Sequence, residues 1–97
     1  MTNGKIISQV SHGISDVTEY LLLNDQSLYK QYKSYGQPKI ILKCPETLLK
    51  TIYDKYKCFA VFDAGLTQVP TGSLTCLVFQ PMIKSQVPDE FETLRLY

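Results

Sequence analysis

The sequence predicts an α/β protein with a small mixed β-sheet of three to four strands, in a single layer with helices on both faces. Two observations predict this class. Long stretches place apolar residues every three to four positions, which is typical of amphipathic helices. Short apolar runs bounded by Gly, Pro or Asp lie between them, which is typical of strands. The length of 97 residues fits one domain over residues 1–97.

The first helix is predicted over residues 5–23, with Asn3 as its cap. Gly13 interrupts this stretch, and glycine costs a helix about 1 kcal/mol relative to alanine. We therefore expect another element to approach the helix closely at Gly13. The apolar residues fall on one stripe at helical spacing: Ile6, Val10, Ile14, Val17 and Leu21.

A short second helix is predicted over residues 26–34, capped by Asn24 or Asp25 and closed by Gly36. Residues 39–44 after it have the pattern of a strand.

A third helix is predicted over residues 45–57, because proline suits a first helical turn. Residues 58–62 form a continuous apolar run, typical of a strand that is buried on both faces. Since a helix links this strand to the strand at 39–44, we expect the two to be parallel.

Residues 63–73 form a loop rich in turn residues, and its length is typical of functional loops. Another strand is predicted over residues 74–79. In the tail we expect a helical turn after Pro88 and a short final strand at 94–97.

Composition excludes several classes of protein. No apolar run approaches the roughly 18 residues of a membrane span, and the opening residues lack a signal-peptide pattern, so a cytoplasmic location without membrane association is expected. The odd number and wide spacing of Cys44, Cys58 and Cys76 favour buried structural thiols over a zinc site or disulfides. A net charge of +1 predicts that any RNA binding depends on a local basic patch.

Polar residues on the first predicted helix are one candidate site. Lys5, Gln9, His12 and Asp16 are spaced by four, three and four residues, so they share one stripe. An ammonium and an imidazole placed in this way could hold a phosphate or polarise a carbonyl. An ordinary solvated helix face explains the same pattern.

The loop after residue 62 is the second candidate site. Asp63 lies at the end of a predicted strand, where α/β proteins often bind ligands. Thr67, Gln68 and Thr75 add hydroxyls and an amide that could orient water for attack on an ester. Simple turn chemistry is the alternative. The sequence contains no Gly-x-Ser-x-Gly elbow and no phosphate-binding glycine loop, and too few candidate ligands for a metal.

Several segments together resemble the type II peptidyl-tRNA hydrolase family. Gly4-Lys-Ile-Ile-Ser-Gln-Val-Ser-His12 is similar to its Gly-Lys-Ile-Ala-Ala-Gln-x-x-His segment, and Gln37-Pro-Lys-Ile-Ile-Leu-Lys43 to its second strand. Asp63-Ala-Gly-Leu-Thr-Gln-Val69 resembles its Asp-Ala-Gly-x-Thr-Gln-Ile/Val loop. Gly72-Ser-Leu-Thr-Cys-Leu77 and Leu94-Arg-Leu-Tyr97 are similar to its closing segments. The likeness covers nearly the whole chain in order.

This resemblance implies hydrolysis of the ester that joins a peptide to the 3′-terminal ribose of tRNA, without a metal or organic cofactor. Peptidyl-tRNA is then the partner. The family's catalytic residues fall on Lys5, His12, Asp63, Thr67 and Thr75, and substrate binding is expected of Gln9 and Gln68. A structural role for His12 between helix and sheet stays open.

The chain departs from the family at two places. The family's first strand is absent before Met1, and Leu66 stands where a basic residue is common. The domain is therefore expected to be N-terminally truncated relative to the family. Three explanations compete: a start codon assigned too late, pairing of two copies as a homodimer, or a reduced sheet with impaired activity. An impaired member acting as an RNA-binding or protein-interaction module is the alternative function, and a likeness of fold alone is the third.

Overall fold

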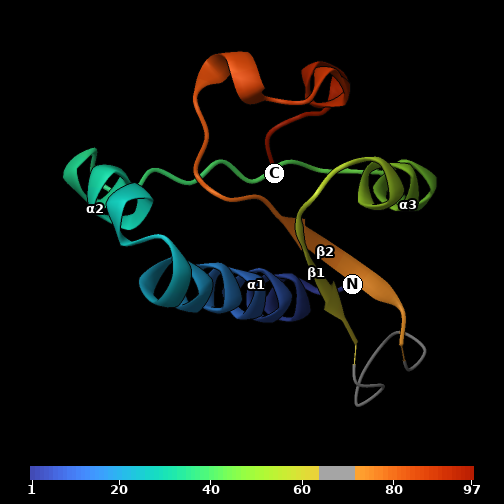
Figure 1. Ribbon diagram of the computed structural model, residues 1–97. Coiled ribbons are helices and arrows are strands. Elements are labelled where there is room, and N and C mark those ends of the chain that lie inside the picture. Colours follow the sequence, from blue (N-terminus) through green and yellow to red (C-terminus); the bar gives the residue numbers. More distant parts are fainter. Residues whose placement is uncertain (64–71) are drawn as a thin grey trace.

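The computed structural model describes residues 1–63 and 72–97, and their elements are shown in Figure 1. The order is three helices, two strands and two short 3-10 helices. They are α1 (Asn3–Asn24), α2 (Gln26–Ser34), α3 (Glu46–Lys55), β1 (Phe59–Phe62), β2 (Leu74–Val78), η1 (Lys84–Gln86) and η2 (Asp89–Thr93). The α/β class expected from the sequence is therefore confirmed.

Local sequence determines where the first two helices begin and end. Thr2 caps α1 by accepting a hydrogen bond from the Lys5 amide, and Asn3, the expected cap, is the first helical residue. Asp25 ends α1 and caps α2, since its carboxylate accepts from the Leu28 amide at 3.1 Å. After α2, Gly36 adopts a φ of 89°, a conformation that favours glycine.

The two strands form an antiparallel sheet with one irregularity. Phe59 pairs with Val78 and Val61 with Cys76, but Phe62 pairs with Leu74, so one residue of β2 is left over as a bulge. That residue is Thr75. The bulge has no counterpart among the expectations from the sequence, because nothing in the local pattern distinguishes it from a regular strand.

Helices contact both faces of this sheet. On one face Tyr20 of α1 meets the ring of Phe59 edge to face at 5.2 Å between centroids. Side chains alternate along a strand, so Phe62 belongs to the other face, where Tyr53 of α3 meets its ring at 6.0 Å. Phe62 is nevertheless 51% exposed, and the expectation that this strand is buried on both faces was wrong.

The expected sheet of three to four strands is not confirmed in the part of the chain that the structure describes. Residues 39–44 form one bridge, in which Leu42 pairs antiparallel with Leu96 of the tail. The expected parallel pairing with 58–62 is not formed, since the only partner strand of β1 described is β2. A strand needs partners along its edge, and Ile40 in the middle of this segment is 76% exposed.

A large hollow lies between α1, residues 37–44, β2 and the tail. Its volume is about 810 Å³ and its lining is mainly apolar. The inner residues of α1, among them Ile6, Val10 and Ile14, line it and are half-buried, whereas Val17 and Leu21 further along the helix are buried. Among the described residues, no helix is both long and apolar enough to cross a membrane.

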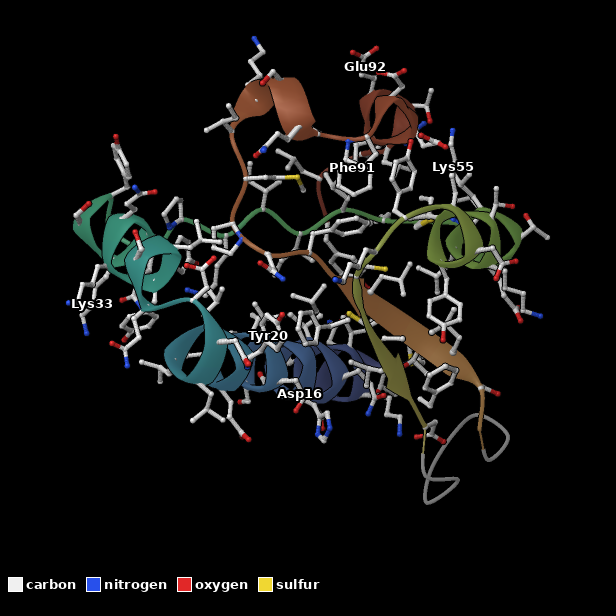
Figure 2. All side chains as sticks on the ribbon, in the orientation of Figure 1. Asp16, Tyr20, Lys33, Lys55, Phe91 and Glu92 are labelled. Carbon is white, nitrogen blue, oxygen red and sulfur yellow. The ribbon has the colours of Figure 1, made fainter. Side chains whose placement is uncertain are left out.

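The C-terminal tail is attached to α3 through Glu90. Lys55 Nζ donates to Glu90 Oε2 at 2.9 Å, and Tyr56 Oη donates to Glu90 Oε1 at 2.6 Å. Phe91 packs beside this contact against Phe79 at 5.2 Å between ring centroids (Figure 2 shows Lys55 and Phe91). The hydrogen bonds from Tyr56 and Lys55 lower the pKa of Glu90 to about 2.

We predict that Gly13→Ala destabilises the fold. An added Cβ would lie 2.4 Å from Val78 Cγ2 and 3.0 Å from Val61 Cγ2, inside contact distance of two stiff side chains. Gly4→Ala in the same helix is the control, since an added Cβ there meets nothing within 4 Å. Denaturant unfolding should show Gly13→Ala less stable than Gly4→Ala by about 1–3 kcal/mol. Equal stabilities would contradict the close approach.

We predict that Glu90→Gln makes the unfolding stability depend less on pH between pH 5 and pH 2. The folded pKa of Glu90 lies below its ordinary 4.5, so the carboxylate stabilises the fold above about pH 4.5 and loses this contribution toward pH 2. Unfolding midpoints of the natural chain and the variant should differ most above pH 5 and converge between pH 4.5 and 2. Glu92→Gln, an exposed carboxylate of η2, is the matched control. A gap that stayed constant down to pH 2 would contradict the role of Glu90.

Candidate active site

Asp63 lies at the end of β1, directly after the strand. Among the described residues it is the one buried polar side chain, with 4% of its surface exposed. Its backbone closes the base of the following loop: its amide donates to the Ser73 carbonyl at 2.9 Å, and its carbonyl accepts from the Gly72 amide at 2.7 Å. These two bonds orient Asp63, and Gly72 accommodates the turn with a φ of 82°.

Lys5 reaches Asp63 from the first turn of α1. Its ammonium forms a direct ion pair with the Asp63 carboxylate, and its side chain is 9% exposed. Burial of two charges is costly unless they neutralise each other, so each of these residues depends on the other. The contact joins positions 58 residues apart and brings the two candidate sites of the sequence together.

Thr75 is brought to the same helix by the bulge in β2. Its hydroxyl lies 2.6 Å from Gln9 Oε1 and 3.1 Å from the Val61 carbonyl. A hydroxyl has one proton, so it can donate to only one of these oxygens at a time. Bulges often redirect a side chain, and here the extra residue faces α1. Gln9 follows Lys5 by one helical turn, so one face of α1 provides both side chains.

His12 and Asp16 continue the same polar stripe but leave the site. His12 is 67% exposed, and its Nε2 lies 3.6 Å from Asp16 Oδ2. Its partner in the described structure is therefore a residue of its own helix, whereas Lys5 and Gln9 reach across to the strands. A side chain packed between helix and sheet would be buried, so the exposure of His12 does not fit a structural role there. Its catalytic role stays a prediction.

Thr67 and Gln68, the remaining expected site residues, lie in 64–71, outside the described residues. The residues that flank this segment are joined by the hydrogen bonds of Asp63 with Gly72 and Ser73.

Thiol and metal chemistry find little support in the described structure. Burial raises the pKa of Cys44, Cys58 and Cys76, which keeps these thiols protonated and weakly nucleophilic. All three are free and half-buried, less enclosed than expected. Residues 1–63 and 72–97 hold no cluster of three His, Cys, Asp or Glu side chains that could bind a metal.

The described site therefore combines a buried cation, a buried carboxylate and an oriented hydroxyl with its amide partner. A cation in a region shielded from water stabilises developing negative charge strongly. A carboxylate beside it can orient or deprotonate water. Together these groups can support hydrolysis of an activated carbonyl compound.

Comparison with known proteins agrees with this chemistry. The family model "Peptidyl-tRNA hydrolase PTH2" matches residues 1–97. The "Peptidyl-tRNA hydrolase" of Sulfurisphaera tokodaii is 35% identical over 91 residues, which cover 84% of this chain and 75% of that protein. The "Probable peptidyl-tRNA hydrolase 2" of Dictyostelium discoideum is 33% identical over 103 residues, covering 100% of this chain and 49% of that protein.

A yeast relative gives the same result. The "Peptidyl-tRNA hydrolase 2" of Saccharomyces cerevisiae is 30% identical over 109 residues, covering 100% of this chain and 52% of that protein. The chain thus spans about half the length of these two eukaryotic relatives. No solved structure matches it. The match along the whole chain confirms the resemblance seen in its motifs, and the chain belongs to the peptidyl-tRNA hydrolase PTH2 family.

Proposed function

We propose that this chain hydrolyses the ester bond between peptide and tRNA in peptidyl-tRNA and so releases free tRNA for translation. The observation that carries the proposal is the buried contact between Lys5 and Asp63, with Thr75 held on the same helix by Gln9. Membership of the family supports the choice of substrate. Two relatives from Dictyostelium discoideum and Sulfurisphaera tokodaii are named as peptidyl-tRNA hydrolases, which supports the same choice.

In this reaction a water oxygen attacks the ester carbonyl, and the carbonyl oxygen becomes an oxyanion. The Lys5 ammonium stabilises that charge, while the Asp63 carboxylate orients the water and accepts its proton. The bond to the 3′-oxygen of the ribose then breaks, and Asp63 passes the proton it took from water to this oxygen as it leaves, which restores the carboxylate. An ester is already activated, so correct positioning supplies much of the rate.

Thr75 orients the water or the ester through its hydroxyl, and Gln9 fixes that hydroxyl at 2.6 Å. Thr67 and Gln68, which lie outside the described residues, contribute a hydroxyl and an amide to the same site in this proposal. His12 assists from the exposed part of the helix, where it contacts the body of the substrate. Peptidyl-tRNA is thus held between α1 and the strand ends.

The hollow beside β2 suggests how a larger sheet would form. β2 pairs with β1 along one edge, and residues of β2 also line the hollow. A second copy of the chain placed against the free edge of β2 would cover the apolar lining beside that strand and extend the sheet to three or four strands. Unpaired strand edges favour such pairing, and the homodimer stays a prediction.

We predict that Asp63→Asn lowers turnover of peptidyl-tRNA by about 10²-fold or more, because the variant lacks the carboxylate that orients water. Release of labelled peptide from peptidyl-tRNA measures this decrease. Asp54→Asn, an exposed site on α3, is the matched control and should retain full turnover.

A second variant separates chemistry from folding, since Asp63→Asn leaves Lys5 buried without its opposite charge. In Lys5→Met/Asp63→Asn neither charge remains, so stability should recover relative to the single variant. Turnover should stay low. Near-normal turnover in either variant, each folded by circular dichroism, would refute the assignment of Asp63.

We predict that Thr75→Val lowers kcat by about ten- to a hundredfold, while Thr75→Ser keeps most of it. Valine has the shape of threonine without the hydroxyl, and serine keeps the hydroxyl that contacts Gln9. Steady-state kinetics on peptidyl-tRNA separate kcat from KM. If valine and serine variants have equal kcat, the hydroxyl has no part in the reaction.

A further inference from the structure

The charges of this chain are distributed unevenly along the sequence. Residues 26–44 carry four of its ten basic side chains and none of its nine acidic ones. The remaining residues are therefore acidic on balance, and the net charge of +1 hides a basic segment. This segment comprises α2 and the extended chain that follows it.

All four lysines of this segment are exposed, and Lys30, Lys33 and Lys39 lie on α2 or shortly after it. Lys33 Nζ lies 5.8 Å from the centroid of the Tyr29 ring, and Lys39 Nζ lies 5.4 Å from that of Tyr32. Lys30 is exposed on the same helix. None of the three forms a salt bridge with another described residue. We call Tyr29, Lys30, Tyr32, Lys33, Tyr35 and Lys39 the α2 basic surface.

The α2 basic surface has a defined shape. Tyr32 Oη donates to the Pro38 carbonyl at 3.0 Å, which fixes the extended chain, and with it Lys39, against the helix. Tyr35 is 83% exposed at the end of α2 and offers a bare ring. The nearest acidic residue in the sequence, Asp25, caps the start of α2 through the Leu28 amide. Figure 2 shows Lys33 directed outward from α2.

The location of this surface relates it to the candidate active site. α1 connects the two: Lys5 is in its first turn, and α2 follows its last residue, Asn24. At 1.5 Å per residue, 19 residues of helix span about 28 Å. Figure 1 shows α2 at the end of α1 remote from the N-terminus. A part of the substrate bound at α2 therefore lies far from the ester and the terminal nucleotide, which the proposed function places near Asp63.

We propose that the α2 basic surface binds the RNA backbone of the tRNA acceptor arm, at a distance from the ester being hydrolysed; this rests on the proposed function. Exposed lysines neutralise phosphates, and an exposed tyrosine such as Tyr35 contacts ribose or stacks on a base, whereas the half-buried Tyr29 and Tyr32 hold the lysines in place. Contacts to the backbone hold an RNA helix by its shape without reading its sequence. α2 has few apolar residues for insertion into a lipid surface, which favours RNA.

The first experiment measures binding of deacylated tRNA as a function of salt. Lys30→Gln/Lys33→Gln/Lys39→Gln should bind about tenfold more weakly, and its salt slope should fall by about one for each phosphate that a lysine no longer neutralises. Lys50→Gln/Lys57→Gln/Lys84→Gln removes the same charge from exposed positions elsewhere and is the matched control. Equal affinities and salt slopes in the two triple variants would overturn the proposal.

The second experiment separates this inference from the proposed hydrolysis. Two substrates are compared: whole peptidyl-tRNA, and an N-acetylaminoacyl ester of a short 3′-terminal oligonucleotide. The α2 triple variant should show a KM about tenfold higher on peptidyl-tRNA with unchanged kcat, and normal kinetics on the fragment. An equal rise in KM on the fragment would overturn the proposal. If the natural chain cleaves neither substrate, hydrolysis is refuted, and tRNA binding still decides the role of the surface.

A membrane is the competing partner for a basic aromatic surface. Phosphatidylserine vesicles test it with the same variants. The natural chain should not bind vesicles at a salt concentration where it binds tRNA. Vesicle binding that disappears in the α2 triple variant, with tRNA binding unaffected, would overturn the proposal in favour of a lipid surface.

Discussion

The close approach of α1 to the two strands determines much of the rest of the structure. Residue 13 has no side chain, and the space that a Cβ would need is occupied by Val78 and Val61. A helix is stiff over this length, so seating it at Gly13 also determines where its first turns lie. Lys5 is eight residues earlier, about 12 Å along the axis, and reaches Asp63 at the end of β1. Gln9, halfway between, reaches Thr75.

Packing and chemistry are therefore coupled in this chain. A buried carboxylate without a partner would lose the solvation of its charge, and the neighbouring ammonium offsets that cost. The same pair lies where the chain begins the 64–71 loop, whose ends are held by the backbone of Asp63. One residue thus provides a charge, follows the end of a strand and joins the flanks of residues 64–71, so in the proposed function substitutions at Asp63 affect stability and reaction together.

Local features of the sequence predicted the helices well. The apolar stripe predicted α1, Asp25 and Gly36 predicted both ends of α2, and Gly13 predicted a close contact. Each of these signals acts within a few residues. The strand pattern at 39–44 was less informative, because a strand also depends on a partner that is distant in sequence; there the described structure provides only Leu96.

The candidate site shows the same limit. Residue patterns alone predicted two separate groups of residues, and only the resemblance to a family joined Lys5 to Asp63. The helical stripe also included His12, since spacing describes a helix face and not what covers it. α1 crosses the strands at an angle (Figure 1), so a stripe parallel to its axis passes from the sheet into solvent. Lys5 and Gln9 lie before that point, and His12 lies beyond it.

The weak net charge of the chain is compatible with binding a polyanion because its charges are separated in space. A buried ion pair contributes almost nothing to the external field, so Lys5 and Asp63 attract no distant phosphate, although the proposed function has them act on the ester. Attraction over longer range has to come from exposed groups that are not neutralised, and α2 with its following segment provides them without a neighbouring acid in residues 26–44.

Because α1 holds the two regions about 28 Å apart, the region proposed to bind most of the substrate need not disturb the electrostatics of the region proposed to react. In the proposed function, each can then change independently: the buried pair sets the rate of ester cleavage, and the exposed lysines set affinity and its dependence on salt.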